Sequence, residues 1–135
     1  MYEKCDIEEM LKGYLVSKSQ LEELENKIAK NKVLLSYKDK LTYINKADKI
    51  KLMNENVRNE EKAEPLRDLV GKVDRMLKAL NNEQRLIVKT YYMYEPKWNY
   101  VNNTYFEVYK ETRTVNQLKN IRDAAMQIML KVINV

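Results

Sequence analysis

The chain of 135 residues contains no histidine, one cysteine, two glycines and two prolines. Without imidazole, Cys5 alone cannot assemble a zinc site, and no histidine can activate a serine or cysteine nucleophile. Gly13 and Gly71 are too few for a phosphate-binding glycine loop, a dinucleotide-binding turn or a hairpin-rich β fold. These absences predict an all-α protein that is not an enzyme and holds no cofactor or metal.

Acidic residues leave one catalytic alternative open, a carboxylate site for magnesium. They occur in runs such as Glu22-Glu23-Glu25 and Glu60-Glu61, and such runs are typical of a solvated helix face. We therefore treat an enzyme as the third hypothesis, without a named reaction.

Long apolar runs are also absent, because no segment approaches the roughly eighteen residues needed to span a bilayer. The amino terminus, Met1-Tyr2-Glu3-Lys4, leads into acidic residues and does not resemble a signal peptide. A single cysteine fits a reducing compartment. The sequence therefore predicts a cytoplasmic protein that makes no membrane contact.

Charge is distributed unevenly along a chain that is rich enough in apolar residues, at 44%, to fold around a core. Residues 1–64 hold thirteen basic and thirteen acidic residues, whereas residues 65–135 hold twelve basic and seven acidic ones. The whole net charge of +5 therefore lies after Glu64. We interpret residues 1–64 and 65–135 as two regions with different roles.

An apolar residue recurs every seven positions at the start of the first region, which predicts a long helix over about 5–36. The members of this seam are Ile7, Tyr14, Leu21, Ile28 and Leu35. Ser17 and Asn31 interrupt the companion row of Met10 and Leu24. Spacing leaves two interpretations open, packing against a later helix of the same chain and a coiled-coil homodimer.

Apolar residues at helical spacing then predict a second helix over about 46–62. It carries Ile50, Met53 and Val57 and is followed by a polar segment before Pro65.

Four shorter helices are expected in the second region. Proline suits the first position of a helix, so Pro65 is expected to begin one of about fifteen residues. Asn81 and Gln84 have the spacing of a capping box, which predicts a second helix ending near Tyr94. A third helix follows Pro96, and the fourth, over about 113–132, is capped by Thr112 or Thr114.

The last two helices have the order of a helix-turn-helix, in which the second helix enters the DNA major groove. If Leu118 and Ala125 face the core, a rotation of 100° per residue places polar residues on the opposite face. These are Asn116, Asn120, Asp123 and Gln127. The side chains expected to contact base edges are Arg113, Asn116, Gln117 and Asn120. Those expected to contact phosphates are Lys97, Lys110 and Lys119.

Eight of the twelve aromatic residues lie between Tyr91 and Tyr109. Stacking on single-stranded bases is one interpretation of such a group. Core packing is the commoner one, and it predicts that Trp98 and Tyr105 are interior. Tyrosines that remain exposed would suit a protein partner.

The order of residues in the second region resembles a known family. The segment Leu80-Asn81-Asn82-Glu83-Gln84-Arg85, the pair Tyr91-Tyr92, Trp98 and Thr112-Arg113-Thr114-Val115 resemble region 4 of bacterial sigma factors. The pattern, over about residues 66–132, is similar to small phage-encoded regulators of the ArpU and RinA kind. The resemblance implies a transcription regulator with double-stranded DNA and RNA polymerase as partners. In this chain, no glycine marks the turn between the last two helices.

Two functions of different classes follow. The first is a sequence-specific DNA-binding regulator of phage type whose last helix reads DNA. The second is a small helical interaction protein, an inhibitor or adaptor of a host protein, without DNA binding. The regulator requires a basic outer face over about 113–120, whereas the adaptor requires an exposed apolar or tyrosine-rich patch.

Overall fold

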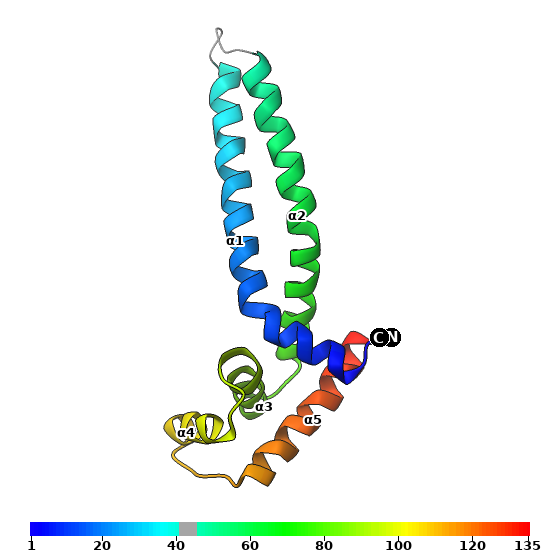
Figure 1. Ribbon diagram of the computed structural model, residues 1–135, viewed down its shortest axis with the longest axis vertical. Coiled ribbons are helices and arrows are strands. Elements are labelled where there is room, and N and C mark those ends of the chain that lie inside the picture. The colour runs from blue at the N-terminus through cyan, green and yellow to red at the C-terminus, as the bar shows by residue number, and fades with distance from the viewer. Residues whose placement is uncertain (41–45) are drawn as a thin grey trace. The chain divides into compact units, whose positions relative to one another are not determined.

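The computed structural model describes residues 1–40 and 46–135, with side chains outside 38–40, and every regular element in this part of the chain is helical (Figure 1). The elements are α1 Lys4–Lys40, α2 Lys46–Lys78, α3 Asn82–Lys89, a π-helical turn η1 Thr90–Tyr94, α4 Trp98–Tyr109 and α5 Val115–Ile133. The prediction of an all-α fold is confirmed. Among the described helices, none is both long and apolar enough to cross a membrane.

Contacts divide the chain into two compact units. One consists of Met1–Leu15 with Val70–Val135, and the other is Val16–Leu69. The boundary expected between residues 64 and 65 falls inside α2, which passes through Pro65 without ending. The expectation that Pro65 begins a new helix is therefore wrong.

Side chains on both sides of Pro65 make contacts that span the proline. Arg67, which follows the proline, lies 2.8 Å from Glu60, which precedes it, and 3.2 Å from Glu25 of α1. The hydrogen bond to Glu60 is the main cause that raises the pKa of Arg67. Ala63, two residues before the proline, is fully buried. These contacts hold the helix on either side of a residue that lacks one backbone hydrogen bond.

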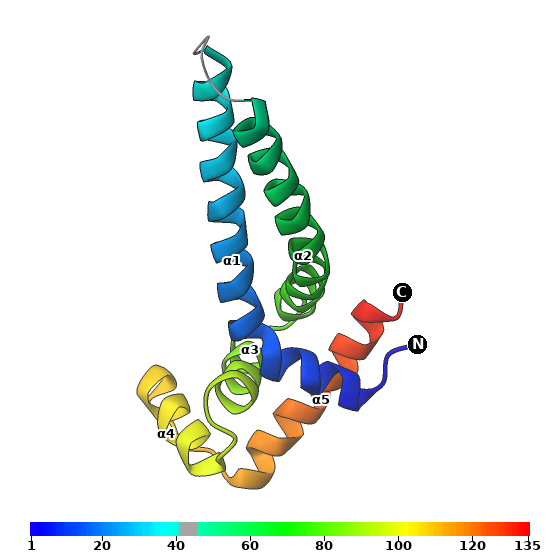
Figure 2. The same ribbon diagram turned by 45° about the horizontal axis from the view of Figure 1, so that its top comes forward.

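The unit Val16–Leu69 is an antiparallel hairpin of α1 and α2 (Figures 1 and 2). Leu21 and Ile28 are buried in it, and so is Asn31. The Asn31 side chain donates a 2.9 Å hydrogen bond to the Asn56 side chain of α2, and Asn56 donates a 3.3 Å bond to the Ile28 carbonyl. The polar residue that interrupts the predicted seam thus finds its partner on the second helix.

The heptad seam of α1 is buried by packing within the chain. Ile7, Tyr14, Leu21 and Ile28 are all buried, and Leu35 is half-buried. Of the two interpretations of this seam, packing within the chain is the one found, because α1 packs against α2. A homodimer through these residues would have to uncover them first.

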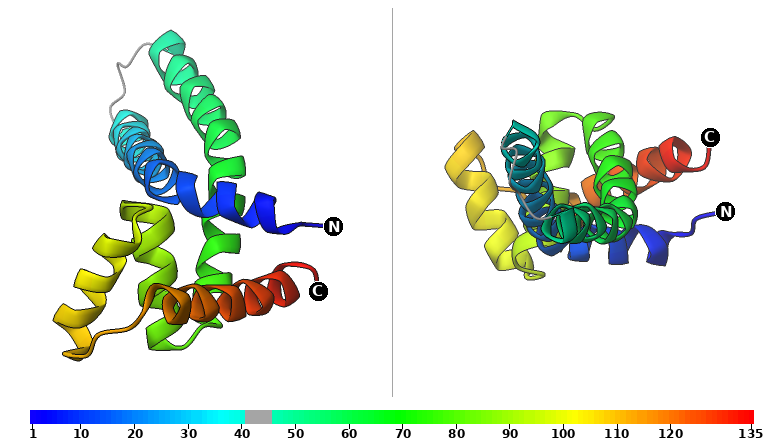
Figure 3. Two further views of the ribbon diagram at one scale, coloured as in Figure 1. Left: turned by 60° about the horizontal axis from the view of Figure 1, so that its bottom comes forward. Right: turned by 90° about the horizontal axis from the view of Figure 1, so that it is seen from above.

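The other unit joins the two ends of the chain. The Tyr2 amide donates a 2.8 Å hydrogen bond to the Asn134 side chain, which donates a 3.0 Å bond back to the Tyr2 carbonyl. The termini accordingly lie beside one another (Figure 3). The Tyr14 hydroxyl donates a 2.5 Å bond to Asp74 near the end of α2. The first fifteen residues therefore pack with residues 70–135, an arrangement that the charge pattern did not predict.

A three-helix core lies within this unit. Ile87 of α3, Val101 and Tyr105 of α4 and Leu118 of α5 form one buried cluster. Half-buried side chains surround it: Leu86, Tyr91, Trp98, Tyr109 and Ile121. The predicted burial of Tyr105 is confirmed, and Trp98 packs against the cluster while remaining partly exposed. This core fixes the positions of α4 and α5.

Candidate nucleic-acid interface

A capping box fixes the start of α5. The Thr114 hydroxyl accepts a 3.1 Å hydrogen bond from the Gln117 amide, and the Gln117 side-chain oxygen accepts a 2.9 Å bond from the Thr114 amide. Of the two predicted caps, Thr114 is the one found, and the box predicted at Asn81 and Gln84 is confirmed as well. The capping bond occupies the Gln117 oxygen, so this residue has its amide NH₂ group left as a donor for a base edge.

The connection between α4 and α5 consists of residues 110–114. Lys110 adopts a left-handed conformation, with φ 59° and ψ 24°, and its amide donates a 2.8 Å hydrogen bond to the Phe106 carbonyl. Glycine usually occupies this position at the end of a helix, because it has no Cβ to clash. The chain closes the turn with a strained lysine instead.

Replacing Lys110 with glycine should have two separate effects, one on the stability of the protein and one on its binding to DNA. Lys110→Gly relieves a left-handed non-glycine residue and should raise the free energy of unfolding by about 1 kcal/mol. If Lys110 contacts a phosphate, the same change should lower the salt slope of DNA binding by about one unit. Urea denaturation and binding at several salt concentrations measure the two effects. Lys110→Ala is the control, because alanine removes the charge but keeps a Cβ in the left-handed conformation. If Lys110→Ala stabilised the protein as much as Lys110→Gly, the left-handed conformation would not be the source of the gain.

The outer face of α5 has the composition predicted for it. Leu118 and Ala125 are fully buried, and every residue expected on the opposite face is exposed: Asn116, Asn120, Asp123 and Gln127. Lys119 is exposed at the edge of this face. Asn116, Lys119 and Asn120 form no side-chain hydrogen bond or ion pair with another described residue, so their polar groups face solvent.

The Asp123 carboxylate on this face is paired with the neighbouring Arg122. Asp123 accepts a 3.1 Å hydrogen bond from the Nε of Arg122, and the Arg122 guanidinium lies 5.1 Å from the centre of the Trp98 ring. Trp98 in turn stacks on Tyr91, with ring centres 4.5 Å apart. Arg122 therefore balances a negative charge that would repel a phosphate backbone. Sequence reasoning missed this cluster, because its members come from three different segments.

Arg113 is tied to the core instead of projecting from it. Its Nε donates a 3.1 Å hydrogen bond to the Tyr105 hydroxyl, which donates a 3.3 Å bond to Glu83. The guanidinium also lies 3.8 Å from Glu83 and 3.9 Å from Glu111. The bond to Tyr105 is the largest of the causes that raise the pKa of Arg113. Arg113 thus links the start of α5 to α3 and α4, a positioning role that spacing did not reveal.

The remaining predicted phosphate contacts lie around α4. Lys97 occupies the position just before α4, where its ammonium lies 3.2 Å from Glu95 and is largely exposed. An exposed pair of this kind contributes little to stability, so a phosphate can compete for the lysine. Lys110 is exposed at the other end of α4.

Comparison of the chain with protein-family models, with curated proteins and with solved structures gave no match. The resemblance to sigma-like phage regulators therefore stays a prediction from the residue pattern.

Proposed function

We propose that this protein binds duplex DNA through the first turns of α5 and acts as a transcription regulator. The observation that carries the proposal is the outer face of α5, where Asn116, Lys119 and Asn120 point to solvent from a helix packed on a three-helix core. A helix-turn-helix presents its second helix to the major groove in this way. The net charge of +5, all within residues 65–135, supplies the attraction to phosphate.

Each side chain has a distinct role in this proposal. Asn116 and Asn120 pair with adenine edges, since a carboxamide can donate to N7 and accept from N6. Lys119, with Lys97 and Lys110, contacts phosphates and gives no sequence information. Arg113 acts through the core: it sets the direction in which α5 leaves the turn, and Gln117 caps the helix.

Selection of duplexes from a random-sequence library, followed by measurement of affinity for the selected site, tests the proposal. Asn116→Ala with Asn120→Ala should weaken binding to the selected site and lower the preference for it over random DNA, by about 1–3 kcal/mol per lost base contact. Lys119→Ala should weaken binding to both duplexes alike and reduce the salt slope by about one unit.

The matched control replaces two exposed amides of α1, Gln20→Ala with Asn26→Ala. This variant should bind as the unchanged protein does. If no sequence is enriched, or if the α5 variant and the α1 variant behave alike, the proposed function is wrong.

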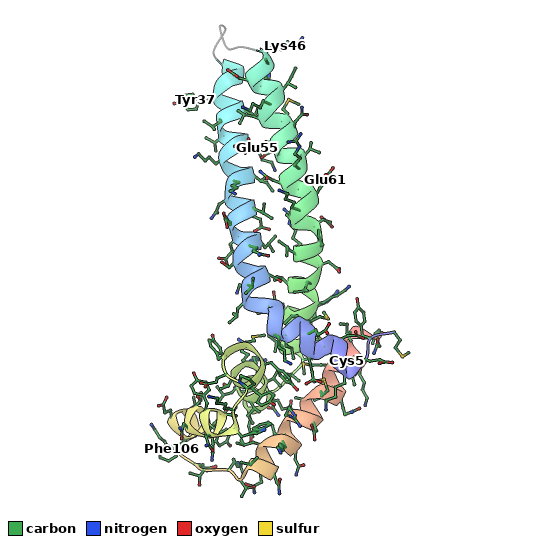
Figure 4. All side chains as sticks on the ribbon, viewed as in Figure 1. Cys5, Tyr37, Lys46, Glu55, Glu61 and Phe106 are labelled. Carbon is green, nitrogen blue, oxygen red and sulfur yellow. The ribbon has the colours of Figure 1, made fainter. Side chains whose placement is uncertain are left out.

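Exposed aromatic and apolar side chains favour a second candidate, a protein-interaction role. Tyr94, Tyr100, Phe106 and Val108 are between 40% and 66% exposed, and Phe106 lies on the outer side of α4 (Figure 4). Interfaces are enriched in tyrosine and phenylalanine. The partner would be RNA polymerase for a regulator, or another host protein for an adaptor. A pull-down from host extract with and without nuclease separates a direct protein partner, which survives removal of nucleic acid, from proteins that co-purify through bound DNA.

A further inference from the structure

The first half of α2 carries an apolar row that the described part of the chain leaves exposed. Ile50, Met53 and Val57 are 48%, 51% and 55% exposed and follow one another at spacings of three and four. Between Lys46 and Lys62, no apolar side chain of this described helix is buried. The row therefore has the pattern of a coiled-coil seam that no described helix of the chain covers.

This row faces away from α1. The side of α2 that packs on α1 is marked by Asn56, Asn59 and Ala63, of which Asn56 bonds to Asn31. At 100° per residue, the centre of the apolar row lies about 120° around the helix from that side. A second helix can reach the row without displacing α1.

Charged residues at the two ends of the row indicate which helix packs on it. Lys46 stands four residues before Ile50, and Glu61 stands four residues after Val57. Together with the three apolar residues they fall within about 80° around the helix. Both charged side chains are exposed, form no ion pair with another described residue, and project from α2 as labelled in Figure 4.

This pattern matches itself when one copy is reversed. In an antiparallel pair centred between residues 53 and 54, Ile50 meets Val57 of the second copy, and Lys46 meets its Glu61. Twofold symmetry repeats both contacts, as an interface between identical surfaces requires. A parallel pair would instead place Lys46 against Lys46 and Glu61 against Glu61.

We infer that residues 46–61 of α2 form an antiparallel contact with the same face of a second copy of this chain. The contact spans about 22 Å of helix, which is short for a permanent interface, so the dimer forms and dissociates with concentration. It uses a surface different from the heptad seam of α1, and it does not depend on the DNA-binding proposal.

Charge reversal in the full-length chain tests the contact. Lys46→Glu alone places two pairs of carboxylates face to face, and Glu61→Lys alone does the same with ammonium groups. Each single variant should self-associate about tenfold more weakly at low salt, measured by sedimentation over a range of concentrations. An equimolar mixture of the two variants should regain the association, because every contact then joins opposite charges.

The controls are Lys51→Glu and Glu55→Lys, which make the same charge changes on a different side of α2. These variants should associate as the unchanged protein does. A protein that is monomeric at every concentration overturns the inference, as does a mixture that associates no better than the single variants. A parallel contact or a different face would leave the single Lys46 and Glu61 variants unaffected, and this result also overturns it.

Discussion

Leu118→Ala is expected to remove a large part of the stability of the three-helix core. Leu118 is fully buried where Ile87, Val101 and Tyr105 meet. Truncating such a leucine costs about 2–5 kcal/mol, because apolar contacts are lost and a cavity remains. The whole stability of a small domain is about 5–15 kcal/mol. The variant should therefore unfold at much lower urea concentration than the unchanged protein.

The fluorescence of Trp98 measures this effect directly, because it is the only tryptophan and packs against the same cluster. Val115→Ala is the control, since Val115 lies on the same helix and is 39% exposed. It should cost less than about 1 kcal/mol. Equal losses for the two variants would mean that α5 does not pack on α3 and α4 through Leu118.

Pro65→Ala is expected to stabilise the hairpin. Because Pro65 lies inside α2, the proline forgoes a backbone hydrogen bond and crowds the preceding turn. Alanine is about 3 kcal/mol more favourable than proline inside a helix, and the gain should approach this figure. The unfolding transition followed by far-ultraviolet circular dichroism should move to higher temperature.

The other proline provides the matched control, because Pro96 lies outside every helix of the structure. Pro96→Ala should bring no comparable gain. An almost unchanged stability for Pro65→Ala would indicate that the residue begins a helix, where proline is favourable, and that α2 is two helices.

Local signals were sufficient to predict much of the fold. Asn81 and Gln84 lie three residues apart, so spacing alone predicted their capping box. For the last helix, spacing left Thr112 and Thr114 open as caps, and the structure forms the box with Thr114 and Gln117. Apolar periodicity similarly predicted that Leu118 and Ala125 face inward, and hence which side of α5 is exposed.

Contacts between distant residues could not be predicted in the same way. Pro65 suits both the start and, at a cost, the interior of a helix, and spacing could not show that Arg67 reaches Glu25 of α1. Spacing likewise could not show that Tyr105 and Glu83 contact the guanidinium of Arg113, a residue predicted to contact a base edge. The pairing of Tyr2 with Asn134 joins residues at opposite ends of the chain.

The most direct measurement of the central claim is a nuclear magnetic resonance titration of the isotope-labelled chain with a duplex carrying the selected site. We expect the largest changes in chemical shift at the backbone amides of residues 113–120, with smaller changes near Lys97 and Lys110. An absence of changes, or changes confined to the hairpin residues 46–61, would contradict the assignment of α5 as the DNA-contacting helix.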